Sequence, residues 1–207
     1  MNTVLKSVAV ALLAASSATA FAASSVDLTV KGLITPSACT PALSNGGTVD
    51  YGKISAKDLN IDQMTPLAEQ SLQLTVTCDA ATLMALDADD NRAGSNHGND
   101  MMEFGLGLIN DTEKLGAMTL RLLSPVADGV AVKAIGSEDG GVTWFTERYL
   151  MPENLISVAN TSADAPIPVQ VLTSEMRVGP KIAPASGLTL TNEAAIDGSV
   201  TVTVRYL

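Results

Sequence analysis

The chain offers few residues that could form a catalytic centre. His97 is its only histidine, so a Ser-His-Asp or Cys-His device has one possible base, which stands among glycine and asparagine. The sequence contains no G-x-S-x-G string, no phosphate-binding loop and no zinc-ligand spacing. Carboxylates are abundant, but no pair of them is singled out for glycoside hydrolysis. We therefore expect no enzymatic activity, no catalytic residue and no cofactor.

A polar stretch, residues 87–101 (DADDNRAGSNHGNDM), is rich in oxygen ligands and raises the question of calcium binding. An EF-hand loop needs glycine at its sixth position and glutamate at its twelfth. Counted from Asp87, those positions hold Arg92 and Gly98, so the motif fails. The pattern favours a solvated loop without a bound metal, and a looser oxygen-ligand site stays open as the alternative.

The string SEDGGVTW is the most enzyme-like in the chain. Ser137, Asp139, Gly141, Thr143 and Trp144 have the spacing of the Asp-box of sialidase-type β-propellers, where the box braces a blade corner and is not catalytic. It occurs once here, in a chain too short for a six-bladed propeller. Asp-Gly-Gly supplies a turn with positive φ, so the string predicts a plain hairpin with the tryptophan packed beneath it.

The N-terminus has the pattern of a cleaved export signal. Lys6 precedes an apolar run, and Ala20-Phe21-Ala22 forms a small-x-small cleavage site. We expect residues 1–22 to be removed and residues 23–207 to form one domain; a membrane anchor is the alternative, but the run is short for a spanning helix. The product is expected to be exported, with no membrane insertion.

The net charge excludes some classes of partner. The chain has 12 Lys and Arg against 22 Asp and Glu, a formal charge of −10, and loss of the leader with Lys6 makes it more acidic. Without a basic cluster, nucleic acid and anionic membranes are not expected as partners. Acidity favours solubility but names no partner.

Strand patterns dominate the elements that would position these residues. Apolar and polar residues alternate in VDLTVKGLI, LQLTVTC and the C-terminal SVTVTVRY. About seven further short runs are bounded by Gly, Asp, Asn or Pro turns; they include 118–123, 130–135, 142–145, 167–172 and 188–191. The best helical candidate, residues 55–71, is broken by Pro66 and is expected to be loop with one turn. The spacing predicts an all-β sandwich.

Two cysteines, Cys39 and Cys78, remain in the exported chain. In an oxidising compartment the expected state is one disulfide between them, and a free thiol pair is the alternative. Closing a loop of this length stabilises the fold by roughly 4 kcal/mol in the chain-entropy description.

Several of these features together resemble the pilin subunits of chaperone–usher fimbriae. The matches are Gly32-Leu33-Ile34, Cys39, Val49-Asp50-Tyr51-Gly52, Cys78 and the penultimate Tyr206. The resemblance covers residues 26–80 and 187–207. The middle of the chain, with DNRAGS and FGLG, is more similar to single-domain fimbrial-like proteins of undefined role in Gram-negative bacteria.

The resemblance implies an incomplete immunoglobulin-like β-sandwich, completed by a strand donated from another chain. Its implied partners are a periplasmic chaperone, an usher and neighbouring subunits of a cell-surface fimbrium. Four residues of the last strand would line the interface with the chaperone or donor strand, and the Leu207 carboxylate would anchor the chaperone. The four are Val200, Val202, Val204 and Tyr206.

The possible donor segment of this chain is short. Val26, Leu28 and Val30 could serve as its apolar side chains, or the subunit receives a strand and gives none. A receiver without a donor segment occupies the distal end of a fibre, so a place at or near the tip and a part in adhesion are hypotheses. The alternative function is a self-contained, secreted or periplasmic lectin-like module that binds through residues 87–101.

Overall fold

The computed structural model describes residues 28–32 and 38–207. The expected signal peptide and Val26 lie outside the described residues. Contacts divide the chain into two units, Met1–Ile34 and Thr35–Leu207. In the first unit, residues 28–32 form no strand, and Leu28 and Val30 are 89% and 86% exposed. In the described part of the chain, no helix has the length and apolarity needed to cross a membrane.

One sheet of the second unit contains the longest strands. Its main path is β1–β3–β14–β8–β12, with each neighbouring pair antiparallel. The short strand β2 pairs with β14, and β5 and β9 pair with β8. The bounds are β1 Cys39–Leu43, β2 Thr65–Pro66, β3 Gln70–Thr82, β5 Phe104–Gly105, β8 Gly116–Ala127, β9 Val130–Ala131, β12 Tyr149–Leu150 and β14 Val169–Ile182.

The other large sheet has the order β11–β10–β13–β4–β15. The last strand, β15, is antiparallel to β4 along its whole length, from Val200 opposite Asp90 to Tyr206 opposite Met84. A third, two-stranded sheet joins β6 and β7. The bounds are β4 Met84–Asp90, β6 Leu108–Ile109, β7 Glu113–Lys114, β10 Lys133–Ser137, β11 Phe145–Thr146, β13 Leu155–Ala159 and β15 Val200–Tyr206.

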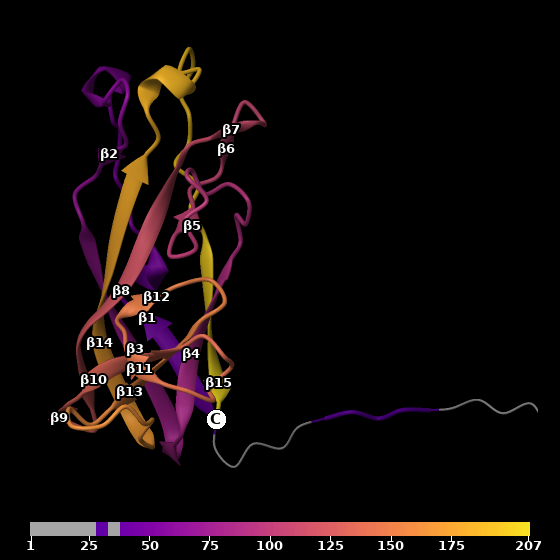
Figure 1. The fold of residues 1–207 in the computed structure, drawn as a ribbon, viewed down its shortest axis with the longest axis vertical. Coiled ribbons are helices and arrows are strands. Elements are labelled where there is room, and N and C mark those ends of the chain that lie inside the picture. Colours follow the sequence, from indigo (N-terminus) through magenta and orange to yellow (C-terminus); the bar gives the residue numbers. More distant parts are fainter. Residues whose placement is uncertain (1–27, 33–37) are drawn as a thin grey trace, which may run out of the picture. The chain divides into compact units, whose positions relative to one another are not determined.

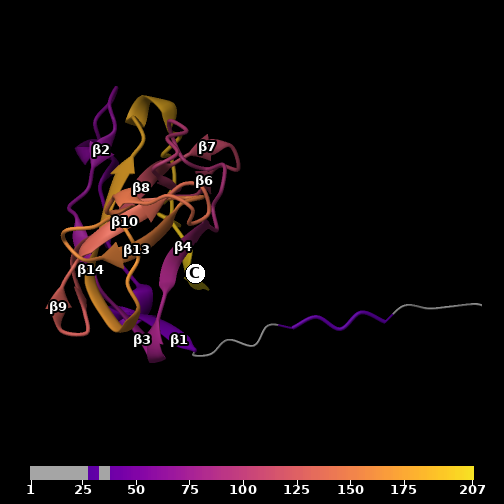
Figure 2. The ribbon, with the colours of Figure 1, turned by 60° about the horizontal axis from the view of Figure 1, so that its bottom comes forward.

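The two large sheets form a sandwich around one apolar core. The inward positions of β3 alternate with exposed ones, so Leu72, Leu74 and Val76 all point to one face. Leu74 and Val76 pack in one buried cluster with Leu86 and Ile156 of the other sheet. Figure 1 shows the long strands β3, β8 and β14 with β4 and β15 beside them, and Figure 2 shows β10 and β13 in front of β8 and β14. The expected all-β sandwich is confirmed.

The expected disulfide is also confirmed. Cys39 and Cys78 face each other on β1 and β3 and are bonded to each other. The described residues contain no α-helix but three single-turn 3-10 helices: η1 Ser44–Gly47, η2 Ala56–Asp58 and η3 Ala185–Gly187. The segment 55–69 is loop with one turn, η2, followed by β2, as its broken pattern indicated, whereas residues 70 and 71 already belong to β3.

Some strand assignments made from the sequence are wrong. Residues 188–191 alternate Leu and Thr but form no strand, because side chains take the backbone groups of Thr189: its N–H donates to Glu113 and its carbonyl accepts from Asn110. Two strands of the second sheet, β4 and β13, were not predicted. The polar stretch 87–101 therefore begins inside a strand, since Asp87–Asp90 belong to β4.

Candidate functional site: a groove beside the last strand

The last strand, β15, lies at the edge of its sheet. Val200, Val202 and Val204 are half-buried and pack against the core, whereas Thr201 and Thr203 are exposed on the opposite face. Among the described residues, the only partner strand of β15 is β4. An edge strand of this kind presents a row of backbone N–H and C=O groups that another strand can pair with.

At its C-terminal end, β15 touches the edge of the other sheet. The Tyr206 hydroxyl accepts a hydrogen bond from the backbone N–H of Cys39, with 3.0 Å between the nitrogen and the oxygen. Cys39 opens β1, and its disulfide ties β1 to β3. The penultimate tyrosine therefore joins the two sheet edges at this end of the sandwich.

Toward the start of β15 the two edges separate, and a cavity of about 240 Å³ lies between them. Val200 and Val202 line one side of it, while Leu43 and Val49, from the end of β1 and the chain that follows, line the other. Most of the remaining apolar lining comes from the core: Leu72, Leu106, Met118, Leu120, Met176 and Val178. The cavity is thus a gap in the sandwich wall that reaches core side chains.

A larger cavity of about 490 Å³ continues the gap beyond the start of β15. It shares Val49, Tyr51 and Ile196 with the smaller cavity, so the two form one groove, which we call the β15 groove. Its two rims are residues 43–59 and residues 190–202, and Leu115 and Ile182 lie at its base. Ile54 and Ile196, one on each rim, are each 37% exposed.

An arginine holds the second rim in place. Arg92 donates from Nε to the backbone carbonyl of Asp197 and from Nη2 to Asp197 Oδ1, at 3.0 and 2.8 Å. The Asp197 N–H in turn donates to the Leu106 carbonyl. The hydrogen bond from Arg92 favours the charged carboxylate and lowers the pKa of Asp197 below its ordinary value. The polar stretch after β4 therefore braces the chain that leads into β15.

Several other polar groups in and beside residues 91–101 are bonded within the protein. Asp90 accepts from the N–H groups of Arg92 and Gly105, and the Ser95 hydroxyl donates to the Arg92 carbonyl and accepts from the N–H of Gly107. No group of three or more His, Cys, Asp or Glu residues in the described part of the chain could hold a metal ion. The geometry assigns this stretch a bracing role.

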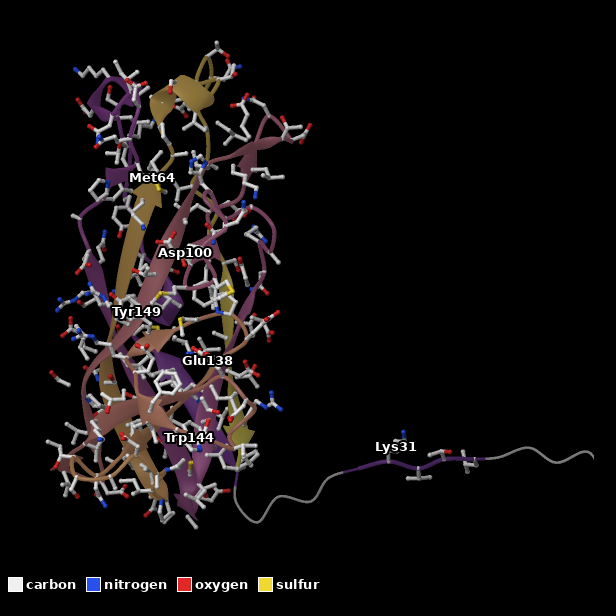
Figure 3. The ribbon with its side chains drawn as sticks, viewed as in Figure 1. Lys31, Met64, Asp100, Glu138, Trp144 and Tyr149 are labelled. Carbon is white, nitrogen blue, oxygen red and sulfur yellow. A yellow bond between two sulfur atoms is a disulfide. The ribbon has the colours of Figure 1, made fainter. Side chains whose placement is uncertain are left out.

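The hairpin predicted from SEDGGVTW is present between β10 and β11. Asp139 accepts from the Thr143 hydroxyl and from the N–H groups of Val142 and Thr143, and Ser137 donates to it as well. These hydrogen bonds, led by that of Thr143, lower the pKa of Asp139 far below its ordinary value. The Trp144 indole, which Figure 3 labels, donates to the Gly141 carbonyl. Asp139 is occupied in closing the turn.

The chain ends close to this hairpin. A Cβ atom built on Gly141 would lie 3.6 Å from Leu207 Cδ2. The Leu207 N–H donates to the Leu83 carbonyl, at 3.1 Å, so the backbone is held up to the last residue. The terminal carboxylate makes no ion pair with the residues that the structure describes.

The predicted interface residues are thus brought together along one strand, but their surroundings differ among them. Val200 and Val202 line the groove, Val204 packs against the core, Tyr206 lies where the sheet edges meet, and Leu207 lies beyond. Sequence reasoning missed most of the two rims. Val49 and Tyr51 stood out only through the family resemblance, and nothing local in residues 190–197 indicated a groove wall.

The fold and this site define a class: an all-β sandwich with one disulfide and an open groove beside its last strand. Comparisons with known proteins find a matching family and related proteins. A family described as a protein of unknown function, DUF1120, matches residues 28–103. That segment includes the disulfide and the first rim of the groove.

Two proteins of Escherichia coli strain K12 are similar to this chain. Protein GltF is 25% identical over an alignment 257 residues long, gaps included, which covers 95% of this chain and 96% of GltF. The uncharacterised protein YhcF is 39% identical over 74 residues, 36% of this chain and 31% of YhcF. The chain is thus related to GltF over nearly its whole length and to YhcF over a shorter part.

Proposed function

We propose that the protein is an exported interaction subunit of fimbrial type, whose β15 groove binds an extended strand of another polypeptide. The observation that carries this proposal is that an apolar groove lies directly beside the edge strand β15. A strand laid along β15 would pair with its backbone groups, and every second side chain would enter the groove. Each apolar side chain so buried contributes about 1.5–3 kcal/mol.

The partners we propose are a periplasmic chaperone, an usher and neighbouring subunits at the cell surface. The chaperone would supply the first strand and hold the free carboxylate of Leu207 with basic side chains, since a carboxylate and an arginine or lysine form strong hydrogen bonds. A neighbouring subunit would later replace that strand. The protein would act through assembly and adhesion, and we assign it no catalytic step.

We further propose that the subunit lies at or near the tip of a fibre. Leu28 and Val30 are exposed and outside any strand, and only three residues would separate the expected cleavage site from Val26. The alternating apolar side chains that this segment could donate are few, Val26, Leu28 and Val30, and a tip position requires that they are not donated to another subunit. The purified protein should then stay monomeric at high concentration; formation of fibres by this chain alone would refute a tip position.

Periplasmic co-expression with a tagged fimbrial chaperone tests the proposed function. We expect Val202→Asp and Ile196→Asp to reduce co-purification about tenfold or more, because each places a charge in the apolar groove. Thr203→Asp is the matched control, since Thr203 lies on the exposed face of the same strand. Ile196 lies on a rim and is more exposed than the core, so its variant tests the groove if Val202→Asp fails to fold.

Equal recovery of the parent protein with and without the chaperone would overturn the proposed function. Truncation of residues 200–207 provides a further variant, which should abolish capture altogether. Circular dichroism and an intact disulfide would show that each point variant is folded. Capture of Val202→Asp and Ile196→Asp at the parental level would show that any complex forms outside the groove.

A further inference from the structure

One ion pair spans the mouth of the β15 groove. Lys53 Nζ lies 2.6 Å from Glu193 Oε1. Lys53 belongs to the rim of residues 43–59 and Glu193 to the rim of residues 190–202, and both residues line the larger cavity. The two side chains, 140 residues apart in sequence, therefore connect opposite walls of the groove.

The surroundings of the pair make it easy to open. The Lys53 and Glu193 side chains are 87% and 86% exposed, so water and salt reach both charges. Exposed pairs of this kind are weak and are screened by salt. On the same rim, the Asp50 carboxylate accepts a hydrogen bond from the Gly52 N–H, at 2.8 Å.

The two rims are held in position by other contacts than this ion pair. The second rim is fixed by Arg92 and by the Asp197–Leu106 backbone bond, and the first is tied through the Tyr51 hydroxyl to the Ala68 carbonyl. Its one distinguishing property is its position across the opening. Because the pair joins the two rims, a side chain that enters or leaves the larger cavity between residues 53 and 193 meets it.

We propose that Lys53 and Glu193 form an ionic latch that sets the rate of entry into the β15 groove and of exit from it. The latch rests on the proposed function for its biological use, which is the entry of a strand from another chain into the groove. A latch that opens in both the empty and the filled groove changes both rates by the same factor. The equilibrium affinity then stays nearly constant, which distinguishes a latch from a direct binding contact.

Nile red, a neutral apolar dye, tests the latch without a protein partner. We expect stopped-flow fluorescence to show uptake and release both accelerated roughly two- to fivefold in Glu193→Gln and Lys53→Gln, with the dissociation constant changed less than about twofold. High salt should accelerate both rates in the parent protein and leave them unchanged in the two variants. The exchanged pair, Lys53→Glu with Glu193→Lys, should restore the slow parental rates.

Lys57→Gln and Glu138→Gln are the matched controls. Each removes the same charge from an exposed residue that makes no ion pair with a described residue, and neither residue lines the larger cavity. Both should keep the parental rates. The latch would be overturned if Glu193→Gln kept the parental rates, or if the affinity changed without a change in both rates. Failure of the exchanged pair to restore the slow rates, or no dye binding by any variant, would overturn it as well.

The two proposals fail separately in these experiments. Slow, salt-sensitive dye entry in a protein that captures no chaperone would leave the latch in place and refute the proposed function. Chaperone capture together with dye rates that do not depend on Lys53 and Glu193 would leave the function in place and refute the latch.

Discussion

Gly105 shows how closely the brace beneath the groove is packed. A Cβ atom at this position would lie 2.0 Å from Ser95 Oγ and 2.8 Å from the Arg92 carbonyl oxygen. The Ser95 hydroxyl is held there because it donates to Arg92 and accepts from the Gly107 N–H. The turn that carries Arg92 therefore fits only because Gly105 has no side chain.

We expect Gly105→Ala to destabilise the protein by about 1–3 kcal/mol, because the added methyl group collides with backbone and a bonded hydroxyl. Gly187→Ala is the control, since a Cβ there meets nothing within 4 Å, and its change should stay within about 0.5 kcal/mol. Urea unfolding of the three proteins measures the difference. Equal stability of Gly105→Ala and the parent would mean that the turn can move away freely.

The ion pair of Asp197 makes a prediction about pH. Arg92 lowers the pKa of Asp197 in the folded protein, so the carboxylate stabilises the fold above its unfolded pKa of about 3.9. That contribution is lost as the pH falls through the folded pKa. Melting temperatures of the parent and Asp197→Asn should therefore differ at pH 7 and converge at pH 2–3; a difference that grows as the pH falls contradicts the assignment.

At the scale of the elements, Tyr206 connects β15 with β1. Its hydroxyl is the acceptor for the Cys39 N–H at the point where the two sheet edges meet. Beyond this contact the edges separate into the groove. The closed end of the groove is thus set by one side-chain hydrogen bond beside the disulfide.

We expect Tyr206→Phe to cost about 0.5–1.5 kcal/mol or less, because the ring remains and only one partly exposed hydrogen bond is lost. The local effect should be larger than the global one. Amide hydrogen exchange at Cys39 should accelerate, while exchange at Val76 in the middle of β3 should keep its parental rate. Unchanged exchange at Cys39 would show that the hydroxyl does not hold the edge.

At the scale of the whole molecule, the two large sheets leave a groove open along one side. Two edge strands, β1 and β15, border the groove, and the described residues supply no strand between them. A strand that binds there is linked to folding, because it binds the folded state and not the unfolded chain. Binding of a chaperone strand should therefore raise the free energy of unfolding of this protein.

A chaperone present at 100 times its dissociation constant should raise the free energy of unfolding by about 2.7 kcal/mol. For a chain of this size that corresponds to a rise in melting temperature of roughly 5–10 °C. Differential scanning calorimetry of the free protein and of the complex measures it. The Ile196→Asp variant should show no rise; an equal rise in that variant would place the stabilising contact elsewhere.

Much of the fold could be read from local pattern. The disulfide follows from two cysteines in an exported chain, and β3 and β15 follow from alternation, since one face of each strand meets the core and the other faces outward. The DGG turn was visible because only certain residues adopt positive φ, as Gly140 and Gly141 do. In each case the controlling interaction lies within a few residues of the pattern.

Two central strands could not be read in this way. Every residue of β13 is buried, so it lacks the alternation that marks a half-exposed strand. β4 ends in acidic residues that rarely favour strands, and it exists because β13 and β15 pair on its two sides. Residues 188–191 show the reverse case, where an alternating pattern meets side chains that take its backbone groups.

The sequence by itself therefore determined the class of the protein and the strand at its C-terminus, because strand alternation, turn chemistry and cysteine pairing act over short distances. Only the tertiary structure decided that β15 lies at an edge, that residues 43–59 and 190–202 face each other, and that Arg92 braces Asp197. Those facts arise from contacts between segments more than a hundred residues apart, as Lys53 and Glu193 are. A pattern within a few residues carries no information about which distant segments will line the same groove.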